Sequence, residues 1–252
     1  MRFLAALLFP LTFPSITAQP TWKEFSLGPV TTSGPPNSQR LKGRGVLSAR
    51  SITAKSLIAL AAGVFPSRVL GPDWLDSECY SITAIVSDDS RGHLRRRLPG
   101  SSSSDEEFWS MFRHEITSRF QLTMHTERKD RDAFVVQPLV GGRLKVRQSK
   151  SLEGGQVNRK GTPMTNVYST VDARGLTLME FCGWLERQLN APVIPSSSLP
   201  PGTWDFHVHW QSGDQRSLLA AVRDQVGLDL VEGNASVEYL IVDRVDRPPS
   251  RL

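Results

Sequence analysis

The stretch WDFHVHW places two histidines where metal chemistry is possible. His207 and His209 are two residues apart, and Asp205 is the nearest acidic residue with the same spacing. Side chains at positions i and i+2 of a strand share one face and lie roughly 6.5–7 Å apart, so two imidazoles can share one metal ion. Zinc needs further ligands, and no other His or Cys lies within this element. We therefore predict a solvated strand face and no metal site, and we keep His207 and His209 as the candidate ligands.

The other catalytic motifs are incomplete. The stretch HEITS begins like the zinc-protease motif H-E-x-x-H, but Ser118 stands where the second histidine belongs. No nucleophile elbow, phosphate-binding loop or dinucleotide-binding glycine motif occurs. We therefore predict no catalytic residues, no cofactor-binding residues and no cofactor. The leading hypothesis is an interaction or sensing protein without catalysis; the alternative is an exported metal-assisted hydrolase that uses His207 and His209.

Residues 1–18 are typical of a secretory signal peptide, with a basic start, a short apolar run and a small residue at Ala18. The apolar run is shorter than the roughly 20 residues that a membrane-spanning helix needs, and Pro10 and Pro14 interrupt it. We expect export to the periplasm or the extracellular space, and no integral membrane segment after cleavage.

The charge and the cysteines narrow the function classes only slightly. The formal net charge is +5, and the densest basic cluster lies in the Gly/Pro/Ser-rich stretch RGHLRRRLPGSSSSDEE, which ends in acidic residues. A nucleic-acid surface would interleave basic and aromatic residues on a folded face, so we predict a solvated loop at 88–105 and no nucleic-acid partner.

Cys79 and Cys182 are compatible both with one disulfide and with two thiols. The oligomeric state is left open.

Two parts of the chain have similar patterns of apolar residues. A shift of 124 residues places 52–86 on 176–210 without a gap, and beyond residue 105 the shift becomes 106. The difference of 18 residues corresponds to an insertion in the first copy, within the loop at 88–105. Apolar positions agree while polar positions vary, as in two copies of one fold. The matched pairs include Leu57 with Phe181, Tyr80 with Trp204, Ile82 with Phe206, Phe112 with Leu218, and Phe120 with Val226.

These patterns predict an α+β protein of two related modules, each with two helices packed on small, mostly antiparallel sheets. In the second module a helix begins after Thr177, with Glu180 as its capping-box partner, and another runs from Asp214 to Gly227. The remaining expected elements are strands at 24–30, 43–49, 79–86, 121–126, 133–137, 164–172 and 203–210, helices at 53–62 and 106–118, and a hairpin of 228–232 with 237–245 that turns at Gly233. The expected organisation is a signal peptide at 1–18, modules at 22–140 and 164–247, a linker at 141–163 and a tail at 248–252.

The last strand of the second module is the predicted interaction surface. Glu238, Leu240 and Val242 share one face, and the prolines that follow cannot extend a strand ladder. An open edge offers unpaired N–H and C=O groups to an incoming strand. A fully paired inner strand is the alternative.

Four runs together resemble a soil-associated bacterial family of exported proteins that is defined by a domain of unknown function. The runs are ITAKSLIALAAGVFPSRVLGPDWLDSECYSITA, FWSMFRHEITSRFQLTMHTERKDRDAFVV, LTLMEFCGWLERQLNAPV and SLLAAVRDQVGLDLVEGNASVEYLIVDRVDRP. The resemblance covers about residues 22–248; it departs from the family at LAAGV, which lacks the usual tyrosine, and at the loop 88–105. Members are sometimes fused behind a BlaR-type membrane metallopeptidase, which implies a sensing or docking role outside the cytoplasm. Within the last run, SLLAAVRDQVGLDLVEGNASVEYLIV is also similar to the short N-terminal domain of secretins and TonB-dependent transducers, which implies another envelope protein or a peptide as partner.

Overall fold

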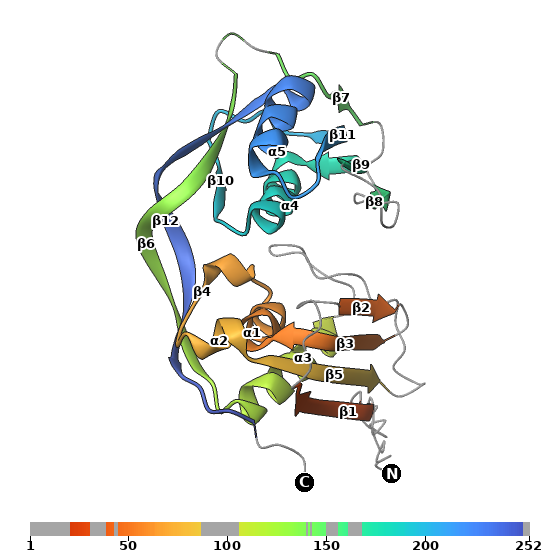
Figure 1. The fold of residues 1–252 in the computed structure, drawn as a ribbon, viewed down its shortest axis with the longest axis vertical. Coiled ribbons are helices and arrows are strands. Elements are labelled where there is room, and N and C mark those ends of the chain that lie inside the picture. Colours follow the sequence, from red (N-terminus) through yellow and green to blue (C-terminus); the bar gives the residue numbers. More distant parts are fainter. Residues whose placement is uncertain are drawn as a thin grey trace, which may run out of the picture.

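The computed structural model describes residues 21–30, 39–42, 45–86, 106–139, 141, 143–149, 156–160 and 168–248. The predicted signal peptide, the inserted loop at 88–105 and the end of the predicted tail lie outside the described residues. Within them the protein is α+β, with five α-helices and three four-stranded sheets. Two helix-and-sheet layers are stacked beside one long two-stranded ribbon, which runs along one side of the molecule (Figure 1).

The first helix-and-sheet layer has the strand order β1-β5-β3-β2, and every neighbouring pair is antiparallel. Its strands are β1 (Trp22–Pro29), β2 (Gln39–Lys42), β3 (Val46–Thr53) and β5 (Cys79–Val86). The accompanying helices and short elements are α1 (Ala54–Ala62), η1 (Pro66–Arg68), β4 (Val69–Leu70), α2 (Trp74–Ser77) and α3 (Glu106–Arg119).

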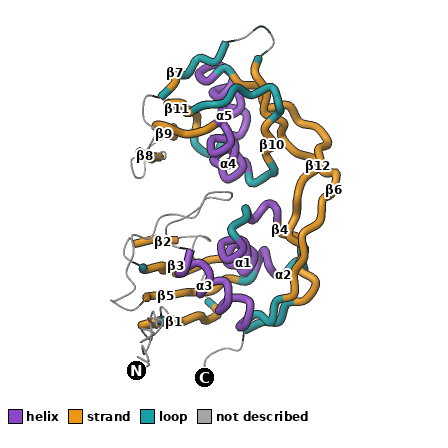
Figure 2. Tube along the Cα trace, turned by 180° about the vertical axis from the view of Figure 1, so that it is seen from behind, coloured by secondary structure: helices purple, strands orange, loops and turns teal. Residues whose placement is uncertain are grey.

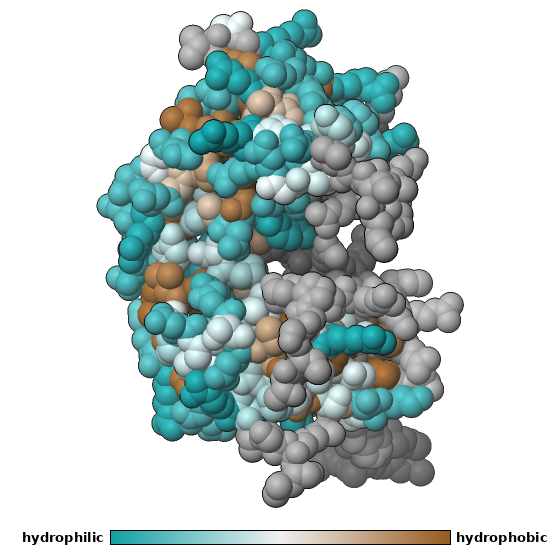
Figure 3. Space-filling model, in the orientation of Figure 1, coloured by the Kyte–Doolittle hydropathy of each residue, from teal (hydrophilic) through white to brown (hydrophobic). Residues whose placement is uncertain are grey.

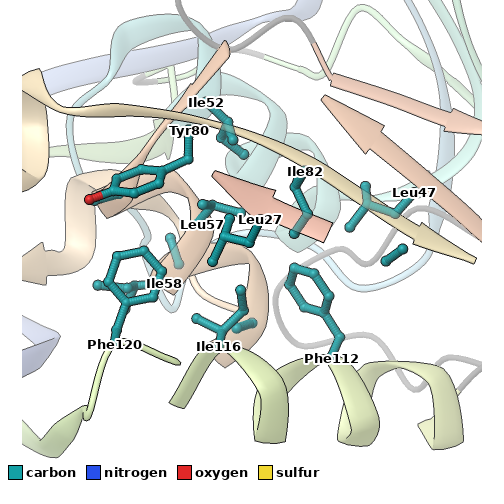
Figure 4. Close-up of a cluster of buried hydrophobic side chains, with 14 of the residues drawn as sticks. Leu27, Leu47, Ile52, Leu57, Ile58, Tyr80, Ile82, Phe112, Ile116 and Phe120 are labelled. Carbon is teal, nitrogen blue, oxygen red and sulfur yellow. The ribbon is translucent and has the colours of Figure 1, made fainter. Parts of the chain in front are cut away.

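Apolar side chains fill the space between this sheet and its helices. Phe112 and Ile116 of α3 point toward Leu27 and Ile82 of the sheet, and Phe120 meets Tyr80 edge to face at 5.3 Å (Figure 4). All six of these core residues are at most 3% exposed. The sequence prediction of a helix after Thr53 is confirmed, since the Thr53 hydroxyl accepts the Ser56 N–H at 3.2 Å and caps α1.

The second layer has the strand order β7-β11-β9-β8, again antiparallel throughout. Its elements are β7 (Arg147–Gln148), β8 (Gln156–Lys160), β9 (Tyr168–Thr177), α4 (Leu178–Leu189), β10 (Val193–Pro195), β11 (Thr203–Gln211) and α5 (Gln215–Ala221), which continues as a π-helical turn at Val222–Val226. The predicted capping box is confirmed, because Thr177 accepts the Glu180 N–H and Glu180 accepts the Thr177 N–H. Gly227 ends the helix at φ 82°, also as predicted.

The two sheets share one register. In each, the strand before the first helix pairs with the strand before the last helix, and each pair contains a bulge at the corresponding place. The equivalent pairs are Leu47–Ala84 and Val171–Val208, Ser48–Thr83 and Asp172–His207, and Val46–Ile85 and Thr170–His209.

The predicted hairpin of the second module is wrong, and so are the two separate strands predicted at 121–126 and 133–137. Residues Thr123–Pro138 form one strand, β6, and Leu228–Arg244 form another, β12, and the two pair with each other along their length. Gly233 does not make a turn but pairs with Ala133. The pattern was misleading because 127–132 are all charged and Gly233 and Asn234 favour turns, yet these residues form the exposed middle of a ribbon, where neither alternation nor turn chemistry identifies a strand.

This β6–β12 ribbon receives one short strand from each layer. The sheet order is β10-β6-β12-β4, with β4 parallel to β12 at Leu240 and β10 parallel to β6 at Phe134. Residues near both ends of the ribbon pack into the two main cores, while its middle contributes a third core of Ala133, Val237 and Tyr239. The ribbon therefore belongs to both layers, and the view from behind shows it joining them on one side (Figure 2).

A buried ion pair joins the two layers directly. Glu186 of α4 is 1% exposed and accepts hydrogen bonds from Arg68 Nε at 2.8 Å and Arg68 Nη2 at 2.6 Å. The Ser67 hydroxyl and the Val193 N–H also donate to this carboxylate, at 2.7 and 3.2 Å. Four donors from two segments, η1 and β10, thus satisfy the one fully buried carboxylate among the described residues.

The surface is mostly polar in the view of Figure 3, where apolar residues form separate groups toward the side of the β6–β12 ribbon. No helix among the described residues combines the length and the apolar character needed to cross a membrane.

Candidate functional site

The alternation of β11 fixes the direction of the two histidines. Phe206, Val208 and Trp210 are buried against the helices, and the Phe206 ring stacks on Phe181 of α4 at 4.1 Å. His207 and His209 therefore lie on the opposite, exposed face of the sheet, as the sequence predicted. A densely packed core beneath the strand holds its backbone in place.

Each histidine is hydrogen-bonded through Nδ1 to its cross-strand neighbour on β9. His207 Nδ1 lies 2.5 Å from Asp172 Oδ1, and His209 Nδ1 lies 2.8 Å from Thr170 Oγ1. Tyr168 stacks on the His209 ring, with centroids 5.0 Å apart and planes inclined by 23°. We call the surface formed by Tyr168, Thr170, Asp172, His207 and His209 the histidine face.

The histidine face is exposed to solvent. The side chains of His207 and Asp172 are 66% and 42% exposed, and Tyr168 is 54% exposed, although tyrosine rings are normally largely covered. Hydrogen bonds and ring stacking order this surface before anything binds to it. An incoming molecule would therefore meet side chains whose positions are already restricted.

Asp205 has other partners. Its carboxylate accepts the Gly175 N–H at 3.0 Å and pairs with Arg147 at 3.3 Å. The Gly175 N–H first, and the side chains of Ser149 and Arg147 after it, hold the pKa of Asp205 below its ordinary value. Within the described part of the chain, no three His, Cys, Asp or Glu side chains lie close enough together to hold a metal ion.

Among its described residues, the first layer has no counterpart of the histidine face. At the positions equivalent to His207 and Asp172 it carries Thr83 and Ser48, which pair in the same register. Ile85 stands at the position equivalent to His209. The two sheets thus share a backbone arrangement but carry different side chains at these positions.

The outer edge of β11 is closed by side chains. Strand β7 pairs only with Trp204 and Asp205, whereas β1 pairs with β5 from Pro29 back to Trp22. Beyond β7, the Gln225 carboxamide accepts the His209 N–H at 2.9 Å and donates to the His209 carbonyl at 2.8 Å. This edge is therefore a poor template for an incoming strand.

The prediction of an open strand edge at Leu240 is wrong. Leu240 lies between Thr126 of β6 and Val69 of β4, so both of its strand neighbours come from this chain. Val242 is buried in the first core, and Glu238 is exposed. The sequence could not show this, because β4 has only two residues and no periodicity. Contact of Glu238, Leu240 and Val242 with a partner stays a prediction.

The two cysteines are free in the structure. Cys182 lies in the second core, where burial raises the pKa of its thiol to about 12. Cys79 is partly exposed at the start of β5.

Sequence reasoning found the two histidines but missed the residues that orient them. Asp172, Thr170 and Tyr168 lie 35 or more residues earlier in the chain, and nothing local connects them to the histidines. The register of the repeated strands was the available signal, since pairing β9 with β11 places Asp172 beside His207.

A family model described as a protein of unknown function (DUF3738) matches residues 55–245. The match begins in α1 and ends just after β12, so it includes the second layer, the ribbon and the histidine face, whereas β1, β2 and β3 of the first layer precede it. No curated protein and no solved structure matches the chain.

Proposed function

The chain belongs to this family of proteins of unknown function (DUF3738), and we propose that it is an exported, non-catalytic interaction or sensing protein that binds its partner on the histidine face. The partner is another envelope protein or a peptide.

The observation that carries the proposal is the difference between the two sheets. One register holds Thr83 and Ser48 in the first layer, but His207 and Asp172 in the second, beside the exposed Tyr168. Aromatic side chains dominate the binding energy of many protein interfaces because they bury a large area at a small cost in conformational entropy. Polar side chains with restricted positions add specificity when a partner covers them.

Exposure favours binding over catalysis at this surface. A His–Asp pair acts as a strong general base when the surrounding protein excludes water, because charges interact more strongly at low dielectric constant. Here the side chains are 66% and 42% exposed, and the surface is one side of a sheet. The alternative, a metal-assisted hydrolase, would also need a third protein ligand, and Asp205 is engaged by Gly175 and Arg147.

Two sequence features support an envelope location. Residues 1–18 have the pattern of a secretory signal, and the chain resembles exported soil-associated proteins. The similarity of 217–242 to the short N-terminal domain of secretins and TonB-dependent transducers supports a protein or peptide as partner.

We also propose that the two layers are copies of one ancestral module. The element positions support this: β5 and β11 begin at Cys79 and Thr203, 124 residues apart, and β6 and β12 end at Pro138 and Arg244, 106 residues apart. The shared strand register and the matching bulges agree with the shift of 124 residues. In a duplicated fold, the side chains on the surface of one copy can change while the other copy keeps its original surface residues.

Site-specific photo-crosslinking in the producing cell tests the proposed surface. A photoreactive phenylalanine analogue at position 168 should give a crosslinked species, and the same analogue at Thr83, on the equivalent face of the first layer, should not. The species from position 168 should disappear when His207 and Asp172 are both replaced by alanine. Equal crosslinking from both positions, or a species that survives the double replacement in a folded protein, would exclude the histidine face as the binding surface.

A further inference from the structure

We infer that His207 and His209 form a two-ligand site for a divalent transition-metal ion, with Cu²⁺ preferred, whose remaining coordination positions are open to water or to a side chain of a partner. The inference concerns the purified chain alone, so it stands or falls independently of the proposed partner.

The first step is the direction of the two rings. Both histidines project from one face of β11 at positions i and i+2, and both rings are held through Nδ1, by Asp172 and by Thr170. The Nε2 atom of each ring makes no hydrogen bond to another described residue and lies on the exposed side of the sheet. Side chains at positions i and i+2 of a strand lie roughly 6.5–7 Å apart on one face, a spacing at which one metal ion can bind both imidazoles.

The second step is the set of groups behind the ligands. A histidine that binds a metal through one nitrogen almost always engages a carboxylate, a carbonyl or water through the other, which fixes the tautomer and makes the ligand more basic. Asp172 does this for His207, because an ionised carboxylate accepts a hydrogen bond and so keeps the proton on Nδ1 and the lone pair on Nε2. Tyr168 restricts the second ring by stacking on it. An ordinary solvated histidine needs none of these contacts.

The third step is the choice of metal. Structural zinc sites use four protein ligands in a closed tetrahedron, which the described residues do not provide here. Two imidazoles leave the other coordination positions of the ion open. For a given set of nitrogen ligands, the binding affinity along the first-row divalent metals is highest for Cu²⁺. We therefore expect Cu²⁺ to bind more tightly than Ni²⁺ or Zn²⁺.

The chain offers a matched control in His125 on β6. It is also exposed, and its Nδ1 lies 2.8 Å from Asp243, so it has the same kind of carboxylate support. Its cross-strand neighbour is Ile241, and no second histidine stands two residues away on β6. Its Nε2 lies 3.8 Å from the Glu127 carboxylate, so the comparison sets two neighbouring histidines against one histidine flanked by two carboxylates.

The test is titration of the untagged chain without residues 1–18 with Cu²⁺, followed by calorimetry and by electron paramagnetic resonance of the bound ion. We expect one site per chain with nitrogen ligands, weakened at least tenfold by His207→Ala or His209→Ala and unchanged by His125→Ala. Asp172→Asn should weaken it about tenfold, at the lower end of the effect of losing a supporting carboxylate. All the altered side chains are exposed, so circular dichroism should be unchanged. Absence of the site in the unaltered chain, or equal affinity in the His207→Ala variant, would overturn the inference.

Discussion

Among single residues, Glu186 has the most demanding environment. It is 1% exposed and accepts hydrogen bonds from Ser67, from both nitrogens of the Arg68 fork and from the Val193 N–H. Charge-assisted bonds of this geometry offset the cost of removing a carboxylate from water. Burial alone would lower the pKa of the Arg68 guanidinium, but the hydrogen bonds and the charge of Glu186 outweigh it and hold this pKa above its ordinary value.

Replacing Glu186 with alanine should lower the free energy of unfolding by about 3 kcal/mol, because it leaves a partly buried cation without its carboxylate and two further donors without an acceptor. Urea denaturation of the two proteins measures the difference. The matched control is Asp76→Ala, which removes the acidic partner of Lys55 from a surface pair in which Asp76 is 65% exposed. That change should cost less than about 1 kcal/mol. A similar small effect of both replacements would show that the Glu186 pair does not hold the layers together.

Two buried acids predict a loss of stability at alkaline pH. Burial raises the pKa of Cys182 from 9.0 to about 12 and the pKa of Tyr80 from 10.0 to about 12. Above pH about 9 the unfolded chain therefore releases protons that the folded chain retains, so the free energy of unfolding is highest below this pH and falls as the pH rises toward 12. Each group contributes at most about 1.4 kcal/mol per pH unit.

Urea denaturation between pH 8 and pH 10.5 measures this slope. A Cys182→Ala variant should show a shallower decline than the unaltered protein over the same range, since one of the two ionising groups is gone. An identical slope in both would mean that the thiol ionises equally in the folded and unfolded chains.

At the scale of elements, two glycines in and just before β12 differ in how well they would tolerate a side chain. Gly233 lies within β12 opposite Ala133, and a Cβ added to it would meet no atom within 4 Å. Gly227 has φ 82°, and an added Cβ would lie 2.8 Å from the Arg143 carbonyl oxygen.

Gly233→Val should therefore raise the free energy of unfolding, by up to about 1 kcal/mol, because valine favours the extended backbone of a strand. Gly227→Ala should lower it by more than about 1 kcal/mol, because alanine fits neither the conformation nor the space. Thermal and urea denaturation measure both changes. A marked destabilisation by valine at 233 would support the turn that the sequence alone suggested.

The sequence predicted the elements that have strong local signals. The capping box of Thr177 and Glu180, the cap at Gly227 and the alternation of β11 are all confirmed, because each depends on residues within a few positions of one another. The β6–β12 ribbon was missed because its pairing is long-range and its middle is charged on β6 and small on β12. For the same reason the support of His207 by Asp172 could be recognised only after the register of β9 was known.

At the scale of the whole molecule, the question is whether the two layers fold as one unit. Three features connect them: the β6–β12 ribbon that contributes to both main cores, the third core around Val237 and Tyr239, and the ion pair of Glu186 with Arg68. A partly unfolded state that lost only one layer would have to separate half of the ribbon and expose the third core. We therefore expect both layers to unfold in a single cooperative transition.

Six tryptophans allow both layers to be followed in one experiment. Trp22, Trp74 and Trp109 belong to the first layer, and Trp184, Trp204 and Trp210 to the second. Fluorine NMR of protein labelled with 5-fluorotryptophan should show all native signals disappearing at one urea concentration. Leu57→Ala, at a fully buried position of α1, should destabilise the protein by about 2–5 kcal/mol and shift the midpoint of the second-layer signals as far as that of the first. Leu185→Ala, equally buried in α4, is the reciprocal control and should shift the first-layer signals in the same way. If each replacement moved only the signals of its own layer, the layers would be independent folding units, and the ribbon and the ion pair would merely connect them.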